Sequence, residues 1–409
     1  MLLRERLESL GRPTPVRRHR PDADLEGLAT SLGGEVRENA CGPYVVVEAV
    51  HAMPPNVGYN AASALFAGVA GEEPLPESGL CFFDSETTGL SGGVGTQVFL
   101  MATAWRIPNG LVVRQYLLAD PVLEDGFLEA IETDLASSCA LVSYNGRSFD
   151  SPVLEGRLVL SRRTPDCLRR PHLDLLHPAR RVFKWRLGQC NLQNVEAMVL
   201  GQDRGEDIPG YLIPELYFAY LRSRDPELLR AVMAHNRQDV VSLSLLLDHL
   251  VEVIAGRGLA HPLDRMGVGR LLESTGMMAD AARVYQALWD EPSSAWDGDV
   301  WPGSWTPVEL SYVVGLRLAT LRRRAQHPEL AQAVLEQLWR RHQRPWEAGI
   351  MLAKDLEHRR KDGAAALEVA SAARIALDDQ PGRTPQEERW LTDLVRRTER
   401  LRRRTGEAA

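Results

Sequence analysis

The sequence predicts a mixed α/β domain that is followed by a region made of helices alone. In the middle of the chain, short apolar runs alternate with turn signals and helical segments, which is typical of a sheet covered by helices. After Pro262 the strand-like runs disappear, and small residues recur at spacings typical of packed helices. A chain of 409 residues also exceeds what one hydrophobic core usually supports, so we expect at least two domains.

The first 75 residues form a mixed segment to which the sequence assigns no role. Helical patterns near residues 2–10 and 25–32 precede an apolar run at 44–50, and Pro74-Leu75-Pro76 then indicates a stiff boundary. We therefore place the domain limits at residues 1–75, 76–258 and 259–409.

The middle segment carries the predicted strands. Apolar runs of strand length occupy residues 80–83, 98–105 and 111–117, and Asn109-Gly110 between the last two is a strong hairpin signal. A further strand is expected at 140–144. Helical stretches cover residues 123–135, 151–160, 192–200 and 226–250. This order predicts a mixed sheet flanked by helices.

The segment from residue 259 onward is expected to be all-helical. Gly276 and Gly363 each mark a turn before an alanine-rich helix, so that helices follow one another in pairs. Such pairs are similar to degenerate tetratricopeptide (TPR-like) repeats, although they keep no strict period of about 34 residues. An irregular helical bundle is an equally good interpretation.

Composition and charge narrow the class of protein. The net charge of -7 argues against nonspecific coating of nucleic acid, although metal-binding carboxylates themselves add negative charge. Arginines are concentrated in residues 396–404. They form either a solvent-exposed charged helix face or a surface that binds phosphate. Five cysteines without metal-ligand spacing, a charged N-terminus and no long apolar segment indicate a cytoplasmic protein without a membrane partner.

Acidic residues follow two of the predicted strands. Asp84 and Glu86 come at the end of the first strand, and residues two apart in a strand point to the same face, so both can converge on one cation. Asp150 comes shortly after the strand at 140–144. A carboxylate at a helix start also stabilises the helix through its dipole, so Asp150 is a candidate ligand only together with the other acidic residues.

A third element, His235 with Asp239, lies in a segment predicted to be helical. Residues four apart on a helix share one face, so the two side chains can act together. A histidine that is hydrogen-bonded to its neighbour is the ordinary explanation of such a pair. The coincidence of three acidic elements makes a shared site the better hypothesis.

Together these elements resemble the three motifs of the DnaQ-like, or DEDD, 3′-to-5′ exonucleases. The matching residues are, in order, Asp84, Glu86, Thr87, Thr88, Gly89, Leu90, Asn145, Phe149, Asp150 and Asp239. The histidine branch of that family places its histidine five residues before the last aspartate, whereas the tyrosine branch places its tyrosine four residues before it. His235 therefore stands at the spacing of the tyrosine branch.

More of the chain resembles the narrower YprB-like group of ribonuclease H-like proteins. The resemblance covers roughly residues 78–250, and its shared segments include residues 174–181, 192–201, 207–210, 217–218 and 235–236. It implies a ribonuclease H-like mixed sheet flanked by helices, followed by helical repeats. It also implies a nuclease of nucleic acid metabolism, in DNA repair, that works beside a helicase partner.

The resemblance implies hydrolysis of phosphodiester bonds with two divalent cations, Mg²⁺ or Mn²⁺, which oxygen ligands favour over zinc. Asp84 would bridge both ions, and Asp150 would hold one of them. Glu86 and Asp239 would complete the site that binds the attacking water. His235 would accept the proton of that water, because imidazoles titrate near neutral pH.

Substrate contacts follow from the same analogy. The residues that would hold the terminal nucleotide are Thr87, Leu90, Asn145 and Phe149. Lys184 and Arg186 are candidate phosphate contacts, with solvated surface charge as the alternative. We expect DNA rather than RNA as substrate.

Two other functions stay open. The first is an inactive nuclease-like module that docks nucleic acid or a helicase, against which the four mutually repelling carboxylates argue. The second is a ribonuclease H-type endonuclease, against which His235 and the segment from Thr87 to Leu90 argue.

Overall fold

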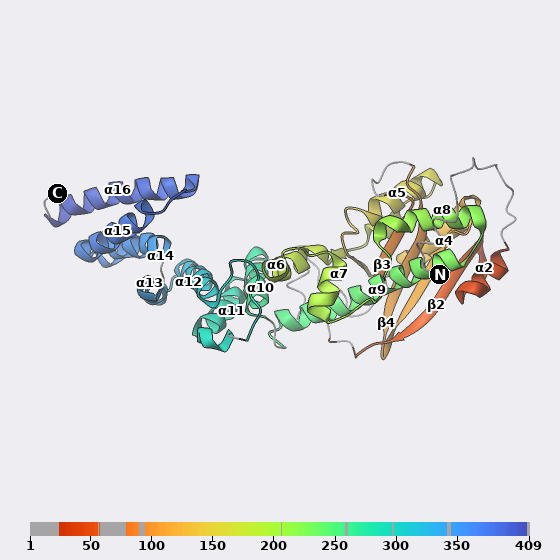
Figure 1. Ribbon diagram of the computed structural model, residues 1–409, viewed down its shortest axis with the longest axis horizontal. Coiled ribbons are helices and arrows are strands. Elements are labelled where there is room, and N and C mark those ends of the chain that lie inside the picture. Colours follow the sequence, from red (N-terminus) through yellow and green to blue (C-terminus); the bar gives the residue numbers. More distant parts are fainter. Residues whose placement is uncertain are drawn as a thin grey trace. The chain divides into compact units, whose positions relative to one another are not determined.

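The computed structural model describes residues 24–55, 57, 79–89, 95–205, 207–257, 261–296, 298–341 and 345–406. The chain divides into two compact units, Met1–Leu259 and Ala260–Ala409, and each is described by itself (Figure 1). The helix expected at residues 2–10 and the proline boundary at 74–76 lie outside the described residues. Within the ranges given above, every helix is too short or too polar to cross a membrane.

The described strands of the first unit form one seven-stranded sheet in the order β1-β2-β5-β4-β3-β6-β7. Neighbours from β1 through β3 in that order are antiparallel, whereas β3, β6 and β7 run parallel to one another. The mixed sheet predicted from the sequence is therefore confirmed. The strands are β1 (Glu35–Asn39), β2 (Gly42–Ala52), β3 (Leu80–Thr87), β4 (Val98–Ile107), β5 (Gly110–Leu117), β6 (Ala140–Ser143) and β7 (His172–Asp174).

The hairpin between β4 and β5 is present, but its turn is displaced by one residue from the expected Asn-Gly. Ile107 pairs with Gly110, so Pro108 and Asn109 form the turn and Gly110 already belongs to β5. A Cβ atom at Gly110 would lie 2.7 Å from the carbonyl oxygen of His51 in β2. Glycine is therefore needed because two strands approach closely, rather than to make the turn.

Part of the N-terminal segment belongs to this sheet. β2 pairs with β5 from Val45 opposite Leu117 to Ala52 opposite Gly110. Helix α2 (Leu25–Leu32) buries Leu28 in the same hydrophobic core. Residues 24–52 thus extend the sheet of a domain that the sequence analysis began at residue 76.

Helices pack on the sheet and position its acidic residues. The 28-residue α9 (Glu227–Ile254) contacts β3, β4 and β5, because a stripe that includes Leu243, Leu247 and Leu250 is buried along it (Figure 1). The single helix expected at 192–200 is instead a short α-helix followed by a π-helix. The remaining elements of this unit are η2 (Pro121–Leu123), α4 (Glu124–Ala136), α5 (Asp150–Leu160), η3 (Asp166–Arg169), α6 (Leu176–Leu187), α7 (Leu192–Val195), η4 (Glu196–Leu200), η5 (Gly210–Leu212), α8 (Ile213–Ser223) and α9 (Glu227–Ile254).

The described part of the second unit is helical, as the sequence predicts, and each α-helix packs against the next one along the chain. Most of these α-helices begin with proline, whose missing N–H costs nothing at the first helical position. Gly276, with φ of 82°, forms the turn between the first two. That the helices are TPR-like stays a prediction. They are α10 (Pro262–Ser274), α11 (Met278–Asp290), η6 (Ser293–Trp296), α12 (Pro307–Arg324), α13 (Pro328–Arg341), α14 (Pro345–Asp355), η7 (Leu356–Arg360), α15 (Gly363–Asp378) and α16 (Pro385–Thr405).

Candidate active site

Strand β3 carries Asp84 and Glu86 within the sheet. The strand extends to Thr87, so both carboxylates belong to it, and the alternation of side chains places them on one face. Asn236 of α9 donates from its side-chain amide to Asp84 Oδ2 at 2.9 Å, and Gln115 of β5 donates to Asn236 Oδ1 at 3.0 Å. This chain of hydrogen bonds fixes the carboxylate of Asp84 against the helix.

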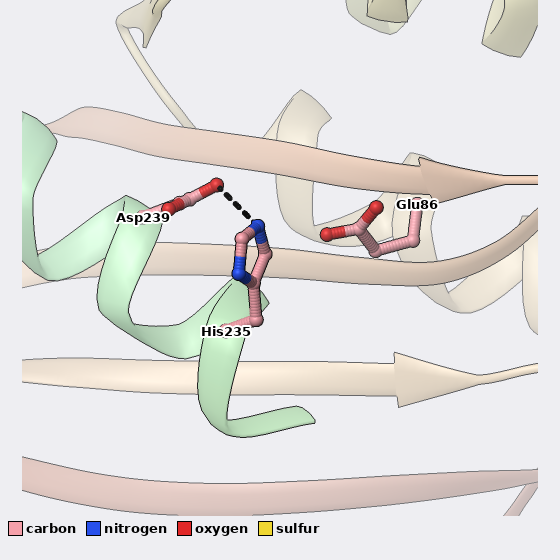
Figure 2. A group of neighbouring side chains, drawn as sticks. All are labelled: Glu86, His235 and Asp239. Atoms are coloured by element: carbon pink, nitrogen blue, oxygen red, sulfur yellow. Dashed lines mark ion pairs between the residues drawn. The ribbon is translucent and has the colours of Figure 1, made fainter. Parts of the chain in front are cut away.

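Helix α9 brings His235 and Asp239 to the same place. A carboxylate oxygen of Glu86, a ring nitrogen of His235 and a carboxylate oxygen of Asp239 lie within 4.8 Å of one another. Figure 2 shows the carboxylate of Glu86 extending from its strand toward the imidazole, which lies 3.7 Å from Asp239 measured from Nε2 to Oδ2. The four-residue spacing of His235 and Asp239 therefore places both on the face of α9 that meets β3.

Asp150 reaches the cluster from a different element. It is the first residue of α5, and its Oδ1 accepts hydrogen bonds from the backbone N–H and the hydroxyl of Ser85 in β3. Ser85 stands between Asp84 and Glu86 in the sequence, so this contact ties the second motif to the first. The structure thus brings together all five residues that the sequence analysis assigned to catalysis.

Burial and the charges of neighbouring carboxylates raise the pKa of Asp84 and of Glu86. Burial is the largest cause of the raised pKa of Asp84, followed by the charges of Asp239, Asp150 and Glu86. Burial and the charges of Asp239 and Asp150 likewise hold the pKa of Glu86 well above its usual range. Burial raises the pKa of Asp150 to about 6, against the hydrogen bonds from Ser85. Such crowding costs free energy unless protons or cations compensate it.

An arginine that the sequence analysis did not select also enters the cluster. The guanidinium of Arg204 donates to Asp239, to Glu196 Oε1 at 2.6 Å and to Asp207 Oδ2 at 3.0 Å. Glu196 is fully buried, and only 9% of the Arg204 side chain is exposed. Asp207 in turn accepts from His235 Nδ1 at 2.7 Å. These residues form a second layer of charge behind the histidine.

The sequence contained a weak signal for this second layer. Asp203, Arg204 and Asp207 form a charged run in a connection between helical segments, where simple solvation is the usual explanation. Glu196 and Asp207 also lie in segments shared with the YprB-like group. Neither observation indicated that the arginine would pair with the last carboxylate, because 35 residues separate Arg204 from Asp239.

The residues expected to contact substrate lie on several elements of the first unit. The hydroxyl of Thr87 donates to the carbonyl of Gly89, and Phe149 immediately precedes α5. Asn145 and Lys184 both line a cavity beside the end of β6. Arg186, the other candidate phosphate contact, donates to the carbonyl of Met198. Leu90 lies outside the described residues.

The donor set fits a divalent cation that prefers oxygen. Glu86, His235 and Asp239 offer ligand atoms within 4.8 Å of one another. Burial, and then the charges of Asp239 and Asp150, raise the pKa of Asp84 and of Glu86, and a dication would relieve the repulsion between these charges. Asp84, Glu86, Asp150 and Asp239 could hold such an ion. The guanidinium on Asp239 already supplies one positive charge to this set.

The crowded carboxylates predict how stability depends on pH in the absence of metal. A carboxyl group whose pKa is raised on folding stabilises the folded state below its unfolded pKa, and this contribution is lost as pH rises through the folded pKa. Asp150 shifts from 3.8 to about 6, and Asp84 and Glu86 shift in the same direction. The free energy of unfolding should therefore fall as pH rises from about 4 to above 6.

Thermal unfolding in EDTA and in Mg²⁺, at about pH 5 and about pH 8, checks this prediction. Mg²⁺ should raise the melting temperature more at the higher pH, because the cation binds ionised carboxylates. Mg²⁺ at about 100 times its Kd would contribute about 2.7 kcal/mol to the free energy of unfolding. An equal effect of Mg²⁺ at both pH values would contradict the prediction.

Comparison with known proteins places these motifs in a family. A family model described as the RNase H superfamily matches residues 81–251. A Bacillus subtilis (strain 168) protein, called uncharacterized protein YprB, is 33% identical over 306 residues, which cover 72% of this chain and 68% of that protein. The family B DNA polymerase of the archaeon Pyrobaculum calidifontis aligns with 69% of this chain and 39% of its own, at 16% identity and a TM-score of 0.37. That last likeness is too loose to support an inference.

Proposed function

Because the chain belongs to the YprB-like family of the ribonuclease H superfamily, we propose that it is a metal-dependent 3′-to-5′ exonuclease of nucleic acid, acting on DNA rather than RNA. The observation that carries the proposal is that Glu86 of β3 meets His235 and Asp239 of α9 within 4.8 Å. Asp84 and Asp150 are tied to the same place by hydrogen bonds from Asn236 and Ser85. DNA repair, with a helicase bound through the helical unit, is the cellular setting that we propose.

Phosphodiester hydrolysis needs an activated water and stabilised charge on the leaving oxygen. Two divalent cations, Mg²⁺ or Mn²⁺, would supply both when held by the four carboxylates. The protein's own contribution is to keep those carboxylates oriented and dry. Asn236 and Ser85 do this for Asp84 and Asp150 through the hydrogen bonds described above.

His235 is oriented to accept a proton. Burial acts to raise the pKa of Asp207, but its hydrogen bond from His235, the charge of protonated His235 and the contact with Arg204 outweigh burial and lower it. An ionised carboxylate only accepts hydrogen bonds, so Nδ1 of His235 must donate to Asp207. A neutral imidazole then carries its lone pair on Nε2, the nitrogen that faces Asp239. This tautomer suits a general base at the cluster.

A second candidate is a docking module that binds nucleic acid without cleaving it. The pairing of Arg204 with Asp239 favours this candidate, because a guanidinium already neutralises a carboxylate that the exonuclease needs for a cation. The exonuclease stays the better proposal because neutral groups donate to two of the other carboxylates, Asn236 to Asp84 and Ser85 to Asp150. In the described contacts no hydrogen bond holds the third, Glu86.

One degradation assay tests the proposal. The full chain with Mg²⁺ or Mn²⁺ should shorten a 5′-labelled single strand one nucleotide at a time, and should release the label from a 3′-labelled strand at once. EDTA should abolish both reactions, because the carboxylates repel one another and cannot polarise phosphate alone. Single-stranded DNA, duplex DNA, RNA and a hybrid are compared in parallel.

Each alternative gives a different result in this assay. Internal fragments from either label would identify an endonuclease. Binding without cleavage under every metal condition would identify the docking module. Full activity in EDTA would exclude the metal-dependent mechanism.

A further inference from the structure

A cavity of about 610 Å³ opens beside the end of β6 in the first unit. This volume falls in the range of sites that hold a small ligand or a nucleotide unit. The lining side chains that bear on its chemistry are Tyr144, Asn145, Arg180, Lys184, Gln189 and Asn191. They supply one aromatic ring, three carboxamides and two cations, and none of the described residues that line the cavity is acidic.

The walls of the cavity are tied to one another. The hydroxyl of Tyr144 donates to the carbonyl of Cys190 at 2.7 Å, which joins the end of β6 to the connection after α6. Buried Asp174 accepts from the backbone N–H of Asn145 at 2.7 Å and of Leu176 at 3.1 Å, which joins the same strand end to the start of α6. Hydrogen bonds therefore hold the walls of the cavity in fixed positions.

The two cations are presented to the cavity from one helix. Arg180 and Lys184 are four residues apart on α6 and so share a face. Both are exposed, and among the described residues no carboxylate lies within ion-pair distance of either. Arg204, in contrast, is enclosed by three carboxylates. Free cations four residues apart on a helix suit successive phosphates of a strand.

The cavity adjoins the active site through the chain itself. Asn145 lines it, and the connection that begins at Asn145 ends five residues later at Asp150. The carbonyl of Asn145 accepts from the backbone N–H of Phe149, so this connection is a tight turn. A nucleic acid strand whose 3′ end reaches Asp150 can therefore continue past Asn145 into the cavity.

We propose that this cavity binds the substrate strand upstream of the scissile bond, with its phosphates on Arg180 and Lys184 and a base against the ring of Tyr144. The inference rests on the proposed function for the identity of its ligand, single-stranded nucleic acid. Base stacking on an aromatic ring tolerates any sequence, so the cavity would give affinity without sequence preference.

The test compares the double variant Arg180→Gln/Lys184→Gln with Arg181→Gln. Arg181 is an exposed neighbour on α6 that does not line the cavity, so its variant controls for loss of surface charge. Binding of a fluorescent oligo(dT) strand of about 12 nucleotides is followed by anisotropy in Ca²⁺ at several salt concentrations. Melting temperatures of all variants confirm that they fold.

The double variant should bind the strand about tenfold more weakly than Arg181→Gln. Its plot of log affinity against log salt should be shallower by about 1.4, because two phosphate contacts on a single strand each contribute about 0.7. In hydrolysis, KM for the same strand should rise about tenfold with kcat changed by less than about threefold. On the 4-nitrophenyl ester of thymidine 5′-monophosphate, which has no upstream nucleotide, the rise in KM of the double variant should be smaller.

The outcomes separate this inference from the proposed function. If the wild-type chain cleaves but the double variant behaves like Arg181→Gln, the cavity assignment is wrong and the exonuclease stands. If the wild-type chain binds without cleaving, the exonuclease proposal fails and anisotropy alone decides. Weaker binding by the double variant then supports the cavity, and equal binding overturns it.

Discussion

Replacing Asp84 with asparagine is expected to lower the rate of nucleic acid hydrolysis by at least about a thousandfold, equivalent to about 4 kcal/mol in the barrier. Asp84 is surrounded by the charges of Asp239, Asp150 and Glu86, so it is the carboxylate best placed to share two cations. Initial rates on a 5′-labelled single strand at saturating Mg²⁺ measure the effect. Asp125→Asn, at an exposed position in the first turn of α4, is the matched control.

The melting temperature of the Asp84→Asn variant shows whether a lower rate comes from lost catalysis or from misfolding. The asparagine has the shape of aspartate, and its carbonyl can still accept the hydrogen bond from Asn236. It also removes a charge that burial disfavours, so the melting temperature in EDTA should be unchanged or higher. A variant that keeps more than a tenth of the wild-type rate would remove Asp84 from the mechanism.

Replacing Arg204 with methionine is expected to lower the free energy of unfolding by about 3 to 5 kcal/mol. The change leaves Glu196, which is fully buried, without the guanidinium that binds both of its oxygens. An unpaired buried charge costs more than the pair contributes, because the desolvation of the remaining carboxylate is no longer offset. Urea unfolding in EDTA at neutral pH measures the loss.

The double variant Glu196→Gln/Arg204→Met distinguishes the ion pair from packing. Removing the charge of Glu196 together with that of Arg204 should restore part of the lost stability, because the fully buried Glu196 then carries no unpaired charge, whereas Asp207 and Asp239 still lack the guanidinium. If the double variant is as unstable as Arg204→Met, the loss does not come from Glu196 but from the packing of the arginine side chain or from its pairs with Asp207 and Asp239. A loss below about 1 kcal/mol in the single variant would show that the pair is effectively solvated.

Local pattern was sufficient to predict much of the fold. The strands β3 to β6 and the helices α4, α5 and α9 were expected within a few residues of their observed limits. Alternation, apolar runs and helical periodicity are properties of contiguous residues, so they can be read without knowing the tertiary structure. The helical character of the second unit follows in the same way from its periodicity and its lack of strand-like runs.

Pairing between distant segments could not be predicted in this way. The residues of β2 pair with residues of β5 that lie 58 to 72 positions further along the chain, from Ala52 with Gly110 to Val45 with Leu117. Residues 35–52 therefore join a sheet from which the predicted domain limits had separated them. The sequence pattern of one strand does not show which other strand it pairs with. The same limit applies to Gly110, whose role depends on the approach of His51 from β2 rather than on the turn.

The sequence by itself was enough to select the five candidate catalytic residues, because each motif that they resemble is a short local segment placed on one strand or helix. The tertiary structure alone decided what surrounds them. It placed Arg204 on Asp239 and Asp207 on His235, and it placed Arg180 and Lys184 along a cavity that Asn145 also lines. Charge and burial depend on every segment that folds around a group, and those segments are fixed only when the whole chain packs.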